Sequence, residues 1–239
     1  MEPHTEESTQ DRRRDWQRRV QFECDIRSVP LPLEYRRSFY PRVVKPLLER
    51  GMAAFLLVLF SPVMLLVALA IRLSDGGDVL FTQDRTGYLG KRFKLYKFRT
   101  MVPNAEELKK ELLELNEHAP DSPDFKLRHD PRVTRLGRFL RKTSIDELPN
   151  LINVVKGDMN LVGPRPTSFD VRTYRMEHYP RLAVKPGITG LWQVSGRADV
   201  DFDERSELDV AYIRQLSLKS DMDLIRRTVT AVRSGKGAR

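Results

Sequence analysis

A run of uncharged residues from Gly51 to Ile71 constrains the fold of this chain more than any other feature. The run lies between Arg50 and Arg72 and has about the 20 residues that cross the hydrocarbon core of a bilayer. Ser61 and Pro62 fall near its middle, where a proline removes one backbone hydrogen bond and clashes with the preceding turn. The sequence therefore predicts a membrane-associated helix that breaks at Ser61-Pro62.

Basic residues flank the apolar run on both sides. A spanning helix would place one basic flank on the side of the membrane that the positive-inside rule disfavours. A re-entrant helix hairpin, which enters the membrane, breaks and returns, keeps both flanks in the cytosol. Spanning helices kinked by proline also exist, so the residues alone leave both topologies open. The flanking cations are Arg36, Arg37, Arg42, Lys45 and Arg50, and then Arg72, Arg85, Lys91, Arg92, Lys94, Lys97 and Arg99.

Charge and cysteine content narrow the partners and the compartment. The 239 residues carry 42 Lys and Arg against 33 Asp and Glu, which gives a net charge of +9. Such a charge suits an acidic partner, whether nucleic acid, anionic lipid or a phosphorylated substrate. The single cysteine, Cys24, excludes an internal disulfide and fits a reducing compartment. The four histidines are scattered, and no pair has the spacing of metal ligands.

We divide the chain into four parts and expect a mixed α/β fold that is mostly helical. Residues 1–38 form a basic arm, 39–75 the membrane-associated segment, 76–233 a small cytosolic domain, and 234–239 a basic tail. Alternating apolar residues over 79–98 predict a β-hairpin that presents Lys97 and Arg99. Apolar spacing predicts helices over 103–118, 203–215 and 218–232, and a polar helix over 167–179 that Pro180 ends.

Two adjacent acids, Asp146 and Glu147, lie at the expected start of a helix that ends near Gly157. The plain interpretation is a capping box, in which Ser144 and Glu147 close the N-terminus of that helix. A second interpretation is a phosphate site, because free N–H groups at a helix N-terminus attract anions. Nearby cations favour the second interpretation, and they include Arg138, Arg141, Lys142 and Arg165, which is held between two prolines.

Six motifs follow one another along the chain: Tyr96-Lys-Phe-Arg-Thr-Met101, Asp130-Pro-Arg-Val-Thr-Arg-Leu-Gly-Arg138, Thr143-Ser-Ile-Asp-Glu-Leu-Pro149, Lys156-Gly-Asp-Met159, Leu161-Val-Gly-Pro-Arg-Pro166 and Lys185-Pro-Gly-Ile-Thr-Gly-Leu-Trp-Gln193. In this order they resemble the bacterial sugar transferases known as monotopic phosphoglycosyl transferases. Those enzymes move a sugar phosphate from a UDP-sugar onto a polyprenol phosphate. Ile145 and Asn150 stand where that family usually has Leu and Gln, and neither departure touches the acids.

The resemblance implies a re-entrant hairpin at Ser61 and Pro62 and a covalent mechanism at Asp146. A carboxylate is ionised at neutral pH and needs no base, so Asp146 would attack the sugar-bearing phosphorus and release UMP. Undecaprenyl phosphate would then take the sugar phosphate from Asp146. Residue types alone allow direct transfer in a ternary complex equally well. Mg²⁺ held by Asp146 and the diphosphate, and a catalytic role for Glu147, are also implied.

The resemblance also implies a setting and a wider binding site. The catalytic domain would face the cytoplasm at the bacterial inner membrane, and the product would start a polysaccharide or glycoconjugate. The expected partners are a UDP-sugar, undecaprenyl phosphate and membrane lipid, with no nucleic acid; a homo-oligomer stays open. Asp158 is either an outer acid of the site or a loop residue. The implied phosphate- and nucleotide-binding residues are Lys97, Arg99, Arg141, Arg165, Lys185, Gln193 and Arg197.

A rival hypothesis is a membrane-anchored basic protein that binds anionic lipid or nucleic acid without catalysis. The positive charge and the apolar run suit this protein equally well. It does not explain Asp146 and Glu147, because a surface for nucleic acid would avoid paired acids. Binding by such a protein would survive the loss of both carboxylates.

Overall fold

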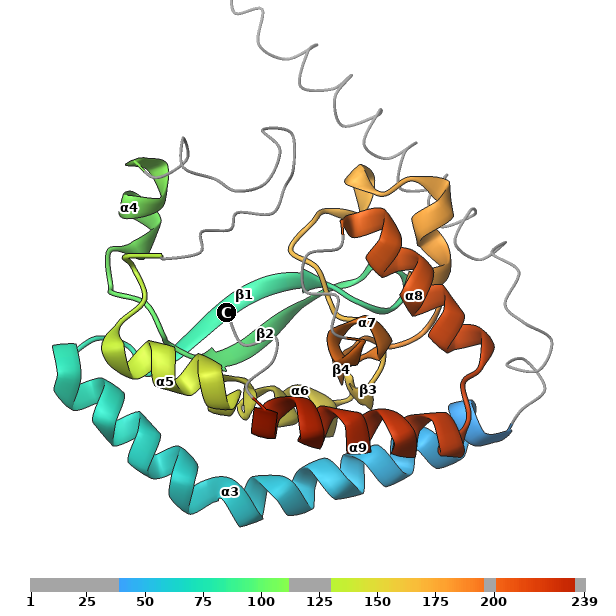
Figure 1. Ribbon diagram of the computed structural model, residues 1–239, viewed down its shortest axis with the longest axis horizontal. Coiled ribbons are helices and arrows are strands. Elements are labelled where there is room, and N and C mark those ends of the chain that lie inside the picture. The colour runs from blue at the N-terminus through green and yellow to red at the C-terminus, as the bar shows by residue number, and fades with distance from the viewer. Residues whose placement is uncertain (1–38, 112–129, 196–200, 235–239) are drawn as a thin grey trace, which may run out of the picture.

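The computed structural model describes residues 39–111, 130–195 and 201–234. Within them the fold is mixed α/β and mostly helical, as the sequence predicted (Figure 1). In chain order the elements are η1 (Tyr40–Val44), α3 (Lys45–Asp75), β1 (Leu80–Thr86), η2 (Tyr88–Gly90), β2 (Arg92–Phe98), α4 (Ala105–Glu111), α5 (Arg135–Thr143), η4 (Ile145–Glu147), α6 (Asn150–Lys156), β3 (Asn160–Val162), η5 (Val171–Thr173), η6 (Met176–Ala183), β4 (Gly187–Thr189), α7 (Leu191–Val194), α8 (Phe202–Arg214) and α9 (Leu218–Ser234).

Two small sheets form the β part of the described structure. β1 and β2 pair antiparallel, with Leu80 opposite Phe98 and Thr86 opposite Arg92, so the predicted hairpin is confirmed. β3 and β4 pair in parallel, and they are joined by the segment that contains η5 and η6. Figure 1 shows α6 below the hairpin and above α3, so α6 lies between the hairpin and the apolar helix.

Helix α3 continues through Ser61 and Pro62, so the predicted break at this pair is wrong. Pro62 has no N–H to donate to the carbonyl of Val58, which lies four residues earlier. The hydroxyl of Ser61 donates to that same carbonyl at 2.7 Å. Because the carbonyl keeps a partner, the helix bends without ending, and Figure 1 shows this bend near its middle.

Both halves of α3 pack on the same folded domain. Ala53 in the first half is fully buried in a cluster that includes Leu151 of α6. Ile71 in the second half packs with Phe98 of β2 and Leu140 of α5. Both halves of α3 are therefore attached to one folded domain, while much of the apolar surface of the helix stays exposed.

That exposed apolar surface makes α3 the one helix of the described residues that is long and apolar enough to cross a membrane. Its 31 residues give a length of about 46 Å. An apolar surface of this extent marks contact with a membrane or with another protein. The exposed residues are Leu47, Leu48, Met52, Phe55, Val58, Leu59, Phe60, Val63, Leu65, Leu66, Leu69 and Leu73.

The remaining helices agree with the sequence only in part. The two closing helices are confirmed as α8 and α9, and the helix expected over 103–118 is α4, beyond which residues 112–118 lie outside the described structure. The polar helix expected over 167–179 is wrong: this segment forms the short 3-10 helices η5 and η6, and Pro180 lies inside η6. Side-chain hydrogen bonds account for the difference, because Asp170 caps η5 by accepting from the N–H of Arg172.

Candidate functional site

The two acids lie on a tight turn between α5 and α6. Ser144 adopts a left-handed conformation, with φ of 57°, and ends α5. The 3-10 helix η4 then carries Asp146 and Glu147, and α6 begins only after Pro149. The capping box, the plainer of the two interpretations of Ser144 and Glu147, is not formed, since Ser144 makes no side-chain cap and the carboxylate of Glu147 accepts from Lys97. Gly157 ends α6 at φ of 86°, as predicted.

Two apolar neighbours anchor the turn that carries the acids. Ile145 packs against the cluster that Ile71 of α3 forms with Phe98 and Leu140, and Leu148 packs against the cluster that contains Ala53 of α3. In the sequence, Asp146 and Glu147 stand between these two anchors. The turn that carries the acids is therefore anchored in two clusters that each also contain a residue of α3.

Glu147 forms the centre of a cationic cluster drawn from three distant parts of the chain. Its Oε1 lies 2.8 Å from Nζ of Lys97 on β2 and 2.5 Å from Nη2 of Arg165, which follows β3. Burial alone would raise the pKa of Glu147, but Arg165 and Lys97 outweigh it and hold that pKa well below its usual range. Glu147 is therefore a firmly ionised carboxylate whose two oxygens are both engaged.

Asp146 has the opposite environment. It is 9% exposed, and no donor among the described residues lies within hydrogen-bond or ion-pair distance of its carboxylate. Burial raises the pKa of Asp146, and the charge of Glu147 raises it further, against the opposing charges of Lys97, Arg141 and Arg165. Asp146 is thus a buried carboxylate near three cations, with both oxygens free to act as a nucleophile or to hold a cation.

Arg141 reaches this site because α5 lies directly against the end of β2. A Cβ atom on Gly137 would lie 2.0 Å from the carbonyl oxygen of Thr100, so only glycine allows this approach. Nε of Arg141 then donates to the hydroxyl of Thr100 at 3.0 Å. Burial lowers the pKa of Arg141, and the charge of Asp146 opposes that effect. The contact orients the guanidinium and places it close enough to Asp146 for its positive charge to lower the pKa of that carboxyl.

Other predicted site residues lie apart from this cluster. Arg99 pairs with Asp75 through Nη1 and Nη2, so it joins the end of β2 to the end of α3. Lys185 lines a different pocket with Lys45, where burial lowers its pKa. Asp158 lies at the far end of α6, 3.7 Å from Lys156.

The loop with the predicted nucleotide contacts is described only in part. Gln193 donates to the carbonyl of Ile188 at 3.2 Å, and its Oε1 has no hydrogen-bond partner among the described residues. Arg205 lies over the ring of Trp192, 5.2 Å from its centroid. Arg197 lies outside the described residues. The roles of Gln193 and Arg197 stay predictions.

Asn150 and Arg85 are the site residues that the sequence analysis missed. Both line a small pocket with Lys97, Glu147 and Arg165. Asn150 is 2% exposed, and its Oδ1 has no hydrogen-bond partner among the described residues. One signal was available, because Asn150 follows Glu147 by three residues and such residues share a helix face. Arg85 gave no such signal, since only the pairing of β1 with β2 brings it here.

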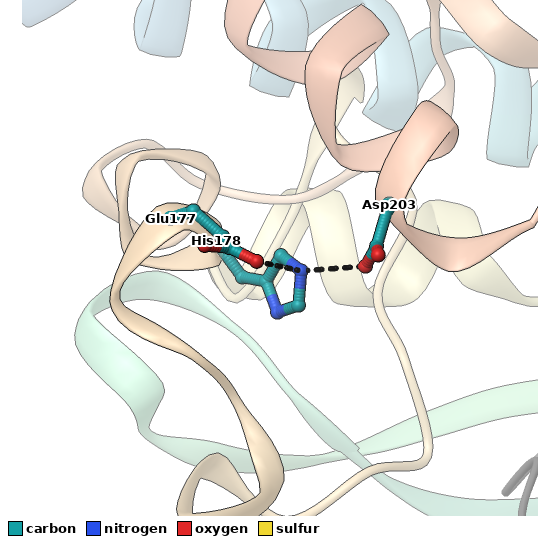
Figure 2. Close-up of side chains that lie close together, drawn as sticks. All are labelled: Glu177, His178 and Asp203. Carbon is teal, nitrogen blue, oxygen red and sulfur yellow. Dashed lines mark hydrogen bonds and ion pairs between the residues drawn. The ribbon is translucent and has the colours of Figure 1, made fainter.

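A second cluster of possible ligands, Glu177, His178 and Asp203, lies at the junction of η6 with α8 (Figure 2). Nδ1 of His178 accepts from the backbone N–H of Arg175 at 3.2 Å, so its Nε2 carries the hydrogen that faces Asp203 at 2.8 Å. A metal on Nε2 would displace that hydrogen and leave a ring with no N–H, unlike common metal-bound histidines. Arg175 also pairs with Asp203. The cluster therefore fits a link that joins η6 to α8.

The fold and the site together define a class of protein. The domain carries a long, exposed apolar helix, and it holds a buried carboxylate that has no partner among the described residues and lies close to the charges of Lys97, Arg141 and Arg165. This arrangement suits an anionic ligand that is met at a membrane surface.

Comparison with known proteins agrees with this class. The bacterial sugar transferase family matches residues 40–235. The chain is 50% identical to the galactosyl transferase CpsE of Streptococcus agalactiae serotype III (strain NEM316) over 167 residues. These residues make up 69% of this chain and 37% of CpsE. Over 200 residues it is 44% identical to the undecaprenyl-phosphate galactose phosphotransferase of Salmonella typhimurium (strain LT2), covering 82% of this chain and 42% of that protein.

A shorter relative is matched over most of its length. The exopolysaccharide production protein ExoY of Rhizobium meliloti (strain 1021) is 41% identical over 193 residues, which cover 78% of this chain and 84% of ExoY. The chain thus spans less than half of CpsE and of the Salmonella protein, and most of ExoY. The chain belongs to the bacterial sugar transferase family.

Proposed function

We propose that this protein is a phosphoglycosyl transferase that moves a hexose 1-phosphate from a UDP-sugar to undecaprenyl phosphate and releases UMP. The observation that carries the proposal is the contrast between the two acids. Glu147 is doubly paired, while Asp146 is buried beside three cations with no partner among the described residues. Relatives named as undecaprenyl-phosphate galactose and N-acetylgalactosamine phosphotransferases support the same reaction class.

The reaction would proceed in two displacements at one phosphorus. A carboxylate oxygen of Asp146 attacks the phosphorus that bears the sugar, and the bond from that phosphorus to the bridging oxygen breaks. UMP leaves with the bonding electron pair. A phosphate oxygen of undecaprenyl phosphate then attacks the same phosphorus and displaces Asp146, which regains its carboxylate.

The cations around Asp146 would offset the negative charge of both substrates. Lys97 and Arg165 already hold Glu147 in place, so they form a preorganised cationic wall that costs little reorganisation during the reaction. Arg141 is fixed by Thr100 on another side. Glu147 would then act mainly by orienting the two cations.

Mg²⁺ fits this donor set in a limited way. Asp146 offers free carboxylate oxygens, which Mg²⁺ prefers, whereas both oxygens of Glu147 are engaged by cations. Asp146 is therefore the one protein ligand that we assign, and substrate oxygens and water would complete the shell. When bound, Mg²⁺ would neutralise charge on the diphosphate and favour the approach of a carboxylate.

We further propose that α3 enters the inner membrane from the cytoplasmic side and returns to it. The two halves of α3 pack on one domain, which does not suit a helix whose ends lie on opposite sides of a bilayer. The bend at Ser61 and Pro62 would lie deepest, and the hydrogen bond from Ser61 to Val58 would satisfy a carbonyl that lipid could not. The catalytic acids would then lie at the level of lipid phosphates, where the product would start a polysaccharide or glycoconjugate.

The function is tested by measuring UMP release from a panel of UDP-sugars. Full-length protein in detergent is incubated with undecaprenyl phosphate, with Mg²⁺ or with EDTA in its place. We expect UMP with one donor or a few related donors, and about a 10²-fold or greater loss in EDTA. Transfer that is undiminished in EDTA would remove the metal from the proposal. Absence of UMP with every common UDP-sugar would contradict the proposed donor class.

The topology is tested by the accessibility of single cysteines. Arg42→Cys and Ser74→Cys, each combined with Cys24→Ser, place a thiol at an exposed position before and after the apolar run. In spheroplasts, an impermeant maleimide is expected to label neither position until the membrane is made permeable, and both positions afterwards. Leu65→Cys is the matched control, because lipid should shield it in both conditions. Labelling of one flank in intact spheroplasts would show a spanning helix.

A further inference from the structure

A buried polar network fastens the start of α3 to the domain. We call it the α3 clamp, and its members are Tyr40, Lys45, Glu49, Tyr212 and Asp221. Nζ of Lys45 donates to Oε1 of Glu49 at 2.8 Å and to Oδ2 of Asp221 on α9 at 2.6 Å. The hydroxyls of Tyr40 and Tyr212 donate to Asp221 at 2.6 and 2.7 Å. Lys45, Glu49, Tyr212 and Asp221 are each no more than 6% exposed.

The clamp also grips strand β3. Oε2 of Glu49 accepts from the backbone N–H of Leu161 at 3.2 Å, and Oε1 accepts from that of Val162 at 3.3 Å. The hydroxyl of Tyr212 lies 3.3 Å from the carbonyl of Val162. A single carboxylate of α3 therefore contacts a lysine of its own helix and the backbone of the strand that leads to Arg165.

The chain between β3 and Arg165 is short and closely packed. Only Gly163 and Pro164 separate Val162 from Arg165. A Cβ atom on Gly163 would lie 2.7 Å from the carbonyl oxygen of Lys185, so this backbone lies directly on the segment before β4. The carbonyl of Arg165 accepts from Nη2 of the buried Arg181 at 2.9 Å. Because two residues, one of them a proline, separate β3 from Arg165, we expect a shift of β3 to be passed on to Arg165 against the hold of Arg181 on its carbonyl.

The chemistry of the clamp favours a role in placement over a role in stability. Burying two carboxylates with one ammonium costs desolvation, and apolar residues of similar size often stabilise a fold as well or better. Burial raises the pKa of Glu49, against the opposing influence of Lys45, so keeping this group charged has a cost. What a satisfied polar network provides is one defined geometry, because each hydrogen bond has a direction.

We propose that Glu49 is a positioning residue: it sets β3, and through β3 it holds Arg165 against Glu147, so that the ion pair of the candidate site depends on this one carboxylate of α3. The inference rests on the proposed function, because it treats Arg165 as one of the cations that, with Lys97, form the cationic wall of the site. Arg165 lies 2.5 Å from Glu147, and a displacement of about 1 Å at a reacting centre can cost about 10²-fold in rate.

The test compares Glu49→Gln with Tyr40→Phe in the full-length protein. Both variants weaken the α3 clamp, but only Glu49→Gln changes the acceptor for the N–H groups of Leu161 and Val162. With detergent-purified protein, the kcat of UMP release for Glu49→Gln is expected to fall about 10- to 100-fold. Its KM values for the UDP-sugar and undecaprenyl phosphate should stay within about threefold of wild type. Tyr40→Phe should keep the wild-type kcat even if its Tm falls.

Hydrogen–deuterium exchange gives a readout that does not depend on catalysis. Amide exchange over residues 160–165 should rise in Glu49→Gln and stay unchanged in Tyr40→Phe. If Glu49→Gln does not fold, Glu49→Asp takes its place, since it keeps the charge beside Lys45 and draws the carboxylate back from β3. Wild-type kcat in the Glu49 variant, a change in KM alone, or unchanged exchange over 160–165 would overturn the proposal. A wild type that releases no UMP contradicts the proposed function, while the exchange result still decides the positioning role.

Discussion

Replacing Asp146 by asparagine is expected to reduce sugar-phosphate transfer by about 10⁴-fold or more while leaving the protein folded and slightly more stable. The activity is lost because a carboxamide is a poor nucleophile and a poor ligand for Mg²⁺. The stability rises because Asp146 is buried without a hydrogen-bond partner among the described residues, so its charge is costly in the native state. Removing that charge relieves the cost and creates no cavity.

The pH dependence of this stability gain follows from the raised pKa of Asp146. In the unfolded chain an aspartate ionises near pH 3.9, and in the native state Asp146 ionises at a higher pH. Wild type therefore loses stability as the pH rises from about 4 through the native pKa. The Tm of Asp146→Asn should exceed that of wild type at pH 7, by a few degrees at most, and the two should converge below about pH 4.

Glu147→Gln is the matched control. It also removes one negative charge, at the next residue, but it is expected to lower the stability that Asp146→Asn raises. The pKa of Glu147 is held low by Arg165 and Lys97, so its charge stabilises the native state at pH 7. Its Tm should fall, since two half-buried cations lose their shared partner. Calorimetry on both variants tests the opposite changes in Tm, and UMP release tests whether Asp146 is the nucleophile. If Asp146→Asn kept a tenth of wild-type activity, the nucleophile would have to be sought elsewhere, with Glu147 as the next candidate.

Replacing Arg165 by methionine is expected to reduce kcat/KM for the UDP-sugar by about 10²- to 10³-fold. Arg165 supplies a planar guanidinium that contacts Glu147 through Nη1 and Nη2. Methionine keeps much of the side-chain length but has neither the charge nor the donors. Arg165→Lys keeps the charge without the fork and should fall between methionine and wild type.

The control for Arg165 is Arg226→Met on α9. The side chain of Arg226 is 79% exposed, and its Nη2 lies 3.2 Å from Oδ1 of Asp223 on the same helix. Its loss should change kcat/KM less than twofold, as for most exposed ion pairs. Steady-state kinetics on the three variants test this ordering. A loss below about threefold in Arg165→Met would remove Arg165 from the cationic wall and would also remove the basis for a role of Glu49.

Local sequence patterns predicted those features that depend on neighbours along the chain. The β1–β2 hairpin follows from alternation and turn glycines, and the end of α6 follows from Gly157, which takes the left-handed conformation that glycine favours. That Asp146 and Glu147 are adjacent, beside several cations, was likewise visible in the sequence. Such features are local, so propensity and spacing are enough to find them.

The errors arose where a distant or unexpected partner decided the outcome. Ser144 and Glu147 have the spacing of a capping box, which was the less favoured of two interpretations, and Lys97, 50 residues away, engages the carboxylate instead. Pro62 has the position of a helix break, but the hydroxyl of Ser61 replaces its missing donor.

Arg99 and Arg165 likewise cannot be told apart by residue type. One pairs with Asp75 at the end of α3, and the other pairs with Glu147. Only the three-dimensional arrangement of their partners separates an anchoring arginine from one in the candidate site.

Ile145 and Leu148, on either side of the acids, pack against clusters that each include a residue of α3, and this has a consequence for which measure of acceptor concentration sets the rate. On the proposed function, a lipid phosphate reaches Asp146 by diffusing within the plane of the membrane and need not leave it. The quantity that governs saturation is then the mole fraction of undecaprenyl phosphate in the bilayer rather than its concentration in the bulk volume. Adding inert lipid at a fixed amount of acceptor would slow the enzyme by surface dilution, while adding water would not.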